Sequence, residues 1–129
     1  MPSVTVVDTS CLILLNKIDR LDLLLKLFDE VTITQTVADE FNKSVPDWIT
    51  VVSIDSKEIK GLASFLDKGE ATSIAYALNN SNSLLLIDEN KGRKVAKEIG
   101  LDITGSLGVL TAAKRKGYIE AVKPILKEV

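Results

Sequence analysis

The stretch "SVTVVDTSCLILLN", residues 3–16, places an aspartate between two apolar segments. The valines in its first half are typical of a buried β-strand over residues 4–7, and the apolar run that follows predicts a short helix over residues 11–16. Asp8 stands where the strand ends. A carboxylate beside a core is costly unless a helix N-terminus or a cation stabilises its charge. The residues alone therefore leave two interpretations open, a helix cap or a functional site.

The rest of the chain continues to alternate strands with helices. The pattern predicts further strands over residues 31–34, 48–54, 84–87 and 102–104. Helices are expected over residues 21–28, from Thr36 to just before Pro46, and over 56–66, 70–78, 92–100, 107–116 and 119–128. Such alternation with short connections predicts an α/β fold with a mostly parallel sheet, in one domain spanning residues 1–129.

Composition excludes several kinds of chemistry. The 129 residues contain no histidine and one cysteine, and the formal net charge is −2. A histidine-based triad, a histidine general base and a zinc site of the histidine type are therefore impossible. No apolar run reaches the roughly 18 residues of a membrane span, and no secretory signal is evident, so a cytoplasmic location without membrane contact is expected.

Four acidic residues occupy positions that a parallel sheet can bring together. Asp8 and Asp88 each follow a predicted strand, Glu40 lies in the helix after the second strand, and Glu70 opens a helix. Ligands of open parallel sheets bind beyond the carboxyl ends of the strands. Oxygen ligands of this kind suit Mg²⁺ or Mn²⁺. Individually, Glu70 could serve only the helix dipole, Glu40 could be a surface acid, and Asp88 could cap a turn.

The order of these motifs resembles the PIN domain family, in particular its VapC-type toxin ribonucleases. The matching segments are "VVDTS", "TVADEF", "LDKGEATSIAYAL", "LLLIDENKGRKVAKEIGL" and "ITGSLGVLTAAKRKGYI". The resemblance implies a three-layer α/β/α fold with a five-stranded parallel sheet in the order 3-2-1-4-5. It also implies a Mg²⁺- or Mn²⁺-dependent endoribonuclease that hydrolyses single-stranded RNA, a homodimer, and the toxin role in a toxin–antitoxin pair, with a small antitoxin protein as partner.

The same resemblance implies roles for individual residues. It makes the catalytic and metal-binding acids Asp8, Glu40, Glu70 and Asp88. Weaker supporting positions are Thr9 or Ser10, which match a hydroxyl near the site, together with Glu89, Asn90 and Ser106. Two departures from the family pattern are visible: Glu70 stands where many members have aspartate, and Asn90 stands where a further acid is usual.

Basic residues and alternative functions complete the expectations. Lys91, Arg93, Lys94 and Lys97 form either a solvated helix face or a rim that contacts RNA phosphates. A haloacid dehalogenase-type phosphatase with Asp8 as nucleophile is disfavoured, because Ser10 occupies the place of its second aspartate. A catalytically inactive PIN-like module that binds RNA or a protein partner is the main alternative. Surplus apolar side chains in residues 21–28 and in the last helices favour the homodimer.

Overall fold

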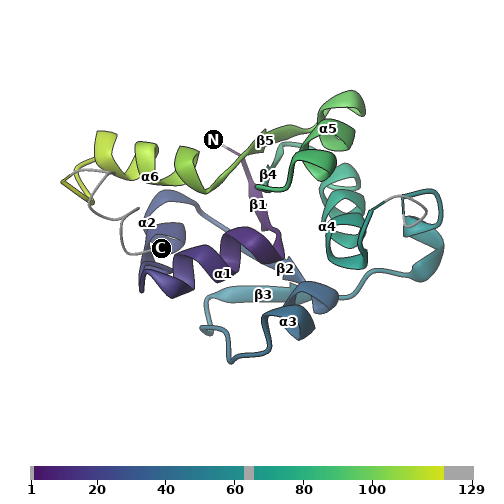
Figure 1. Ribbon diagram of the computed structural model, residues 1–129, viewed down its shortest axis with the longest axis horizontal. Helices are drawn as coiled ribbons and strands as arrows, with labels where there is room; N and C mark the ends of the chain where they lie inside the picture. The colour runs from purple at the N-terminus through teal and green to yellow at the C-terminus, as the bar shows by residue number, and fades with distance from the viewer. Residues whose placement is uncertain (1, 63–65, 121–129) are drawn as a thin grey trace.

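The computed structural model describes residues 2–62 and 66–120 and contains a five-stranded sheet (Figure 1). The strand order is β3-β2-β1-β4-β5, and all four neighbouring pairs are parallel. This confirms the predicted sheet and its order. The strands are β1 Val4–Val7, β2 Val31–Thr34, β3 Ile49–Val52, β4 Ser83–Leu86 and β5 Asp102–Thr104.

Helices cover both faces of the sheet, which gives the three-layer α/β/α arrangement (Figure 1). They are α1 Thr9–Lys17, α2 Asp22–Leu27, α3 Gln35–Phe41, the short 3₁₀ helix η1 Ser56–Ile59, α4 Lys68–Leu78, α5 Asn90–Glu98 and α6 Ser106–Arg115. None of the helices in the described part of the chain is long and apolar enough to cross a membrane.

Most of the expected helices have ends within two residues of those in the structure, and two differ further. The helix after β2 begins before Thr36, because the Thr34 hydroxyl accepts a hydrogen bond from the Val37 backbone N–H at 3.2 Å and caps α3. One residue thus ends a strand and caps a helix. Of the helix expected over 56–66, the described residues form only η1, and residues 63–65 lie outside the description. The helix expected over 119–128 also lies outside it, apart from its first two residues.

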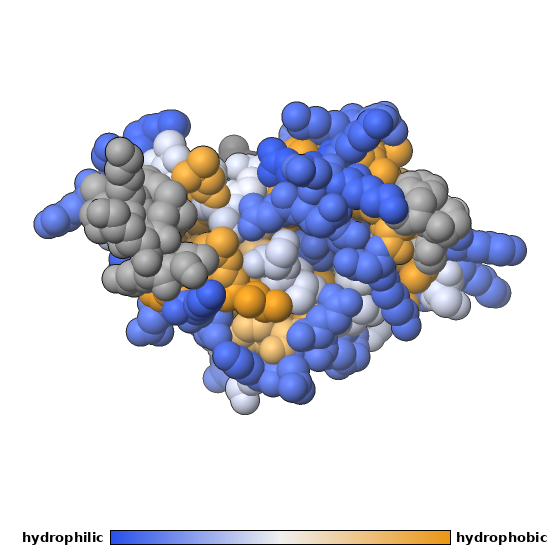
Figure 2. Space-filling view, in the orientation of Figure 1, coloured by the Kyte–Doolittle hydropathy of each residue, from blue (hydrophilic) through white to orange (hydrophobic). Residues whose placement is uncertain are grey.

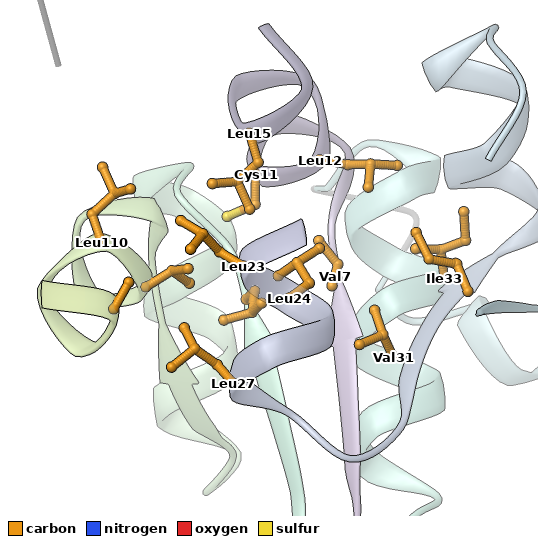
Figure 3. Close-up of a cluster of buried hydrophobic side chains, with 14 of the residues drawn as sticks. Val7, Cys11, Leu12, Leu15, Leu23, Leu24, Leu27, Val31, Ile33 and Leu110 are labelled. Carbon is orange, nitrogen blue, oxygen red and sulfur yellow. The ribbon is translucent and has the colours of Figure 1, made fainter. Parts of the chain in front are cut away.

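Consecutive valines of β1 point to opposite faces of the sheet and so enter two separate cores. Val7 packs with apolar residues of α1, α2, α3 and α6, several of which Figure 3 shows closing around it. Val6 packs in a second cluster with residues of α4 and α5, including Ile74 and Ala96. Both valines are fully buried. Burial on two faces explains why consecutive residues at the ends of β1 and β4 are apolar, instead of alternating with polar ones.

The connections place a switch point between β1 and β4. From β1 the chain runs through α1 and α2 to β2, while from β4 it runs through α5 to β5 on the opposite side. The two strands pair from Val4 with Ser83 to Val7 with Leu86, so they end side by side. Crevices at such a point are where open parallel sheets bind ligands.

The fully buried Leu12 of α1 tests the core that Figure 3 shows. Leu12→Ala should lower the free energy of unfolding by about 2–5 kcal/mol, because it removes buried methyl groups and leaves a cavity. Leu25→Ala on α2, where the side chain is 52% exposed, is the control and should change it by less than about 1 kcal/mol. Urea denaturation followed by circular dichroism measures both, and equal losses would contradict the described core.

Candidate functional site

A pocket of about 390 Å³ lies at the carboxyl end of β1, and residues of α1, α3 and α4 line it. Acidic side chains dominate its lining, and no lysine or arginine of the described residues takes part. The lining residues are Asp8, Thr9, Ser10, Ile13, Glu40, Asp67, Glu70 and Glu89. Crowded carboxylates without a basic partner favour the uptake of protons or of a cation.

Asp8 is the most deeply placed acid of this acidic pocket, with 3% of its surface exposed. Its backbone N–H donates to the Leu86 carbonyl at 2.9 Å, which fixes it between the ends of β1 and β4. It precedes α1, yet its side chain does not cap that helix; the carboxylate accepts from the Ser73 hydroxyl at 3.3 Å. Burial raises the pKa of Asp8 to about 6, and the neighbouring charges of Asp67 and Glu40 add to the rise.

Glu70 has two roles, one for each carboxylate oxygen. Its Oε1 accepts from the Asp67 backbone N–H at 3.2 Å, while Asp67 Oδ1 accepts from the Glu70 N–H at 2.8 Å. This capping box fixes the start of α4. Its Oε2 is buried and receives no hydrogen bond within the described residues. Capping the start of α4 therefore accounts for only one of the two carboxylate oxygens of Glu70.

Glu89 is the neighbour of Glu70 across the pocket. Burial raises the pKa of Glu70 to about 8, and the nearby Glu89 carboxylate adds to that rise. The pKa of Glu89 is lowered, first by this interaction with Glu70 and then by the N–H groups of Gly92 and Lys91, which donate to its side chain. Near neutral pH, Glu70 is thus the member of the pair that holds a proton when no cation is present.

Glu40 reaches the pocket from α3. The Thr9 hydroxyl donates to Glu40 Oε1 at 2.5 Å and ties α3 to the start of α1. The Glu40 carboxylate also lies directly against Gly69, where any Cβ would overlap it. On the other side, a Cβ at Gly92 would lie 3.0 Å from Glu70 Oε2. The two glycines therefore leave the room that these two carboxylates occupy.

Asp88 follows β4 at the same edge of the sheet but does not line the acidic pocket. Its Oδ1 accepts from the Ser106 backbone N–H at 2.7 Å, and its Oδ2 accepts from the Ser106 hydroxyl at 2.5 Å. The Cys11 thiol donates to Oδ2 at 3.3 Å. The structure thus brings Asp8, Glu40 and Glu70 to one pocket and holds Asp88 beside it, at the start of α6.

The weaker candidates are dispersed around this edge. Ser10 lines the pocket as an exposed side chain, and Asn90 is the exposed first residue of α5. Lys91 is exposed next to Glu89. Arg93 is half-buried, because its Nη1 donates to the Ile87 carbonyl at 2.8 Å. Of the four basic residues expected at the rim, the three lysines are exposed surface side chains, at positions 91, 94 and 97.

The donor atoms of the pocket match the chemistry of a divalent cation. Mg²⁺ and Mn²⁺ bind carboxylate oxygens, which Asp8, Glu40 and Glu70 supply from three separate elements. Glu70 Oε2 has no hydrogen-bond partner among the described residues, so it can take either a proton or a cation. Across residues 2–62 and 66–120, however, no three acidic, cysteine or histidine side chains already stand in an arrangement that could hold a metal ion. To bind one, these side chains would have to turn toward each other.

Three participants in the site were not predicted from the sequence. Asp67 lines the pocket and raises the pKa of Asp8, and Ser73 and Cys11 hydrogen-bond to Asp8 and Asp88. Ser73 lies three residues after Glu70, so helical spacing already places both on one face of α4. The sequence "DKGE" is itself a capping-box pattern, which is the signal for Asp67.

Comparison with known proteins gives one result that covers almost the whole chain. A family model described as a PIN domain matches residues 4–129. No curated protein matches the sequence.

The raised pKa values predict that stability of the metal-free protein falls as pH rises. Between the ordinary pKa values of 3.8 and 4.5 and the folded values of about 6 for Asp8 and about 8 for Glu70, the folded state binds more protons than the unfolded state. The contribution of these two groups to the free energy of unfolding therefore decreases as pH rises through that range. Asp8→Asn should therefore stabilise the protein at pH 7 in EDTA by about 3 kcal/mol, at about 1.4 kcal/mol per pKa unit.

Urea denaturation at pH 4, 5, 6, 7 and 8 measures this difference. The gain from Asp8→Asn should be small at pH 4, grow to pH 6 and then level off. Asp102→Asn is the control, because Asp102 is an exposed aspartate at the opposite edge of the sheet. A gain that is independent of pH, or equal in the control, would contradict a buried charge on Asp8.

Proposed function

Because this chain belongs to the PIN domain family, whose fold is of the nuclease type, we propose that it is a metal-dependent endoribonuclease acting on single-stranded RNA. One observation carries the proposal: the buried carboxylates of Asp8 and Glu70 share a pocket with further acids and with no basic side chain of the described residues. PIN domains generally use divalent metal ions. Mg²⁺ or Mn²⁺ is the cofactor that such a pocket would take.

The chain's own residues divide the work as follows. A bound divalent ion supplies the positive charge that lowers the pKa of a water and offsets charge developing on the phosphate. Asp8, Glu40 and Glu70 would hold it, with Asp8 oriented by the end of β1 and Glu40 by the Thr9 hydroxyl. Since the chain has no histidine, proton transfer falls to carboxylates. Before a cation binds, Glu70, whose pKa is raised to about 8, holds a proton near neutral pH, and it would release that proton on taking up the ion.

Asp88 has a supporting role in this proposal. Its oxygens accept hydrogen bonds from Ser106 and Cys11, so it anchors the start of α6 next to the pocket. It would become a metal ligand only by giving up one of these bonds. Lys91 on the exposed face of α5 would contribute a weak contact to RNA phosphate.

A second candidate function has one observation in its favour. Asn90 stands where a further acid is usual in the family pattern, as a binding module without catalysis would allow. Such a module would bind RNA or a protein partner through the same edge of the sheet. The phosphatase alternative is set aside by the family membership.

The proposal extends to the partners of a toxin. The sequence resembles VapC-type ribonucleases, which supports the toxin half of a toxin–antitoxin pair with a small antitoxin protein. Apolar side chains that remain exposed support a homodimer. Ile13, Leu25 and Leu107 are 46%, 52% and 59% exposed, and Figure 2 shows apolar surface gathered near α1 and α6.

Cleavage of RNA tests the activity directly. The purified protein should cut single-stranded RNA when Mg²⁺ or Mn²⁺ is supplied, and EDTA should stop it. Asp8→Asn should lower the rate by on the order of 10²–10³-fold, because a preorganised charge at the reacting group is lost. Gel analysis of a labelled oligonucleotide measures the rate.

The control is Asp102→Asn, prepared in parallel, which should cut like the wild type. Equal cleavage by wild type and Asp8→Asn would indicate a contaminating nuclease and contradict the assignment. In the same preparations, Mn²⁺ should raise the melting temperature of the wild type, since a ligand that binds only the native state stabilises it, and should raise that of Asp8→Asn less. No cleavage together with no metal response would favour the binding module.

The homodimer is tested by light scattering at micromolar concentration. The wild type should have twice the mass of the 14.0 kDa chain. Leu25→Glu should shift the mass toward the monomer, because it places a charge in a surface that association would bury. Thr50→Glu, at an exposed position on β3, is the control. A monomeric wild type would exclude the dimer.

A further inference from the structure

A second hollow, of about 550 Å³, lies beside the acidic pocket between α5, the end of β5 and α6. The consecutive residues Asp88 and Glu89 separate the two spaces, since Asp88 lines the hollow and Glu89 lines the acidic pocket. We call it the arginine hollow, because Arg93 and Arg115 both line it. The proposed nuclease function does not yet account for it.

The charge of the arginine hollow is opposite to that of the acidic pocket. Two arginines and one acidic residue, Asp88, are the charged residues that line it. Both oxygens of Asp88 already accept hydrogen bonds from Ser106 at the N-terminal end of α6, which stabilises that negative charge. Positive charge is therefore in excess in this space.

The arginines keep donors available for a ligand. Arg93 uses Nη1 to bind the Ile87 carbonyl at 2.8 Å, which holds its guanidinium at the wall of the hollow. Arg115 is exposed and makes no ion pair with any residue in 2–62 or 66–120. A guanidinium presents several N–H donors in a planar fork that matches the oxygens of a phosphate.

The start of α6 leaves space at the base of the arginine hollow. A Cβ at Gly105 would lie 2.5 Å from Asp88 Oδ1 and 2.9 Å from Arg93 Nη1. Only a glycine lets these groups lie against the backbone and keeps the hollow open next to them. From Gly105 to Arg115, α6 extends the hollow over about 15 Å at 1.5 Å per residue.

We propose that the arginine hollow binds the sugar–phosphate backbone of the single-stranded RNA substrate, with Arg93 and Arg115 each contacting a phosphate along it. The proposal rests on the nuclease function, and it identifies where the part of the RNA that lies away from the cleaved bond is held. The acidic pocket repels phosphate until a cation is bound, so affinity for RNA has to come from nearby positive groups. The arginine hollow is the adjoining space that supplies them.

The test is RNA binding without cleavage. Fluorescence anisotropy with a labelled single-stranded oligouridylate, in EDTA, measures the affinity of the full chain between 50 and 200 mM salt. Arg115→Gln should weaken binding about fivefold near 0.1 M salt and reduce the salt slope of log K by about 0.7, the value for one phosphate contact on a single strand. Lys114→Gln, one residue away and outside the hollow, removes the same charge and should stay within about twofold.

The outcomes separate this proposal from the nuclease function. Equal losses in Arg115→Gln and Lys114→Gln, or no loss in either, would overturn the arginine hollow even if the wild type cleaves RNA. If Arg115→Gln weakens RNA binding but the wild type never cleaves RNA, the RNA-binding role of the arginine hollow is supported and the nuclease function is contradicted. If an oligoglutamate peptide binds with Arg115 dependence while oligouridylate does not, the hollow belongs to an acidic protein partner and the RNA proposal is wrong.

Discussion

Parallel pairing of β1 with β4, in a layer that is covered by helices on both sides, determines where every charge of the site can lie. Val6 and Val7 enter two different cores, so β1 cannot shift by one residue without exchanging its two faces. With that register fixed, Asp8 has to follow Val7 at the edge, bonded through its N–H to Leu86. A carboxylate is thus placed by the packing of valines, and its raised pKa is the electrostatic cost of that packing.

The short connection after β4 directs two consecutive acidic side chains to different places. Asp88 turns to α6 and binds Ser106, while Glu89 caps α5 and faces Glu70. The two consecutive acids therefore serve two adjoining spaces of opposite character. An acidic space suits a cation and an arginine-lined one suits a phosphate, and a nuclease that cuts a polyanion has use for both.

Sequence patterns predicted the strands well, because β-branched runs and apolar spacing are local signals. The strand order came from the family resemblance, and the structure confirms it. What the sequence did not reveal depends on contacts between distant residues: the Cys11 thiol meets Asp88 across 77 positions, and Ser73 meets Asp8 across 65. The start of α3 was placed too late because Thr34 is both strand and cap, and strand propensity masked its second role. The sequence did not reveal that Asp88 lies outside the acidic pocket, because its contact with Ser106 depends on the path of β5.

The capping box of α4 links the architecture of the pocket to its ligand chemistry. Glu70 Oε1 accepts the Asp67 N–H, so the carboxylate that faces the pocket is also part of the first turn of the helix. Turning Glu70 toward a ligand would release that N–H, and a lost cap costs about 1 kcal/mol. Ligand binding at this site is therefore weaker, because it has to open the first turn of α4. Amide hydrogen exchange at Asp67 would become faster when a cation binds, although the free energy of unfolding of the whole protein would rise.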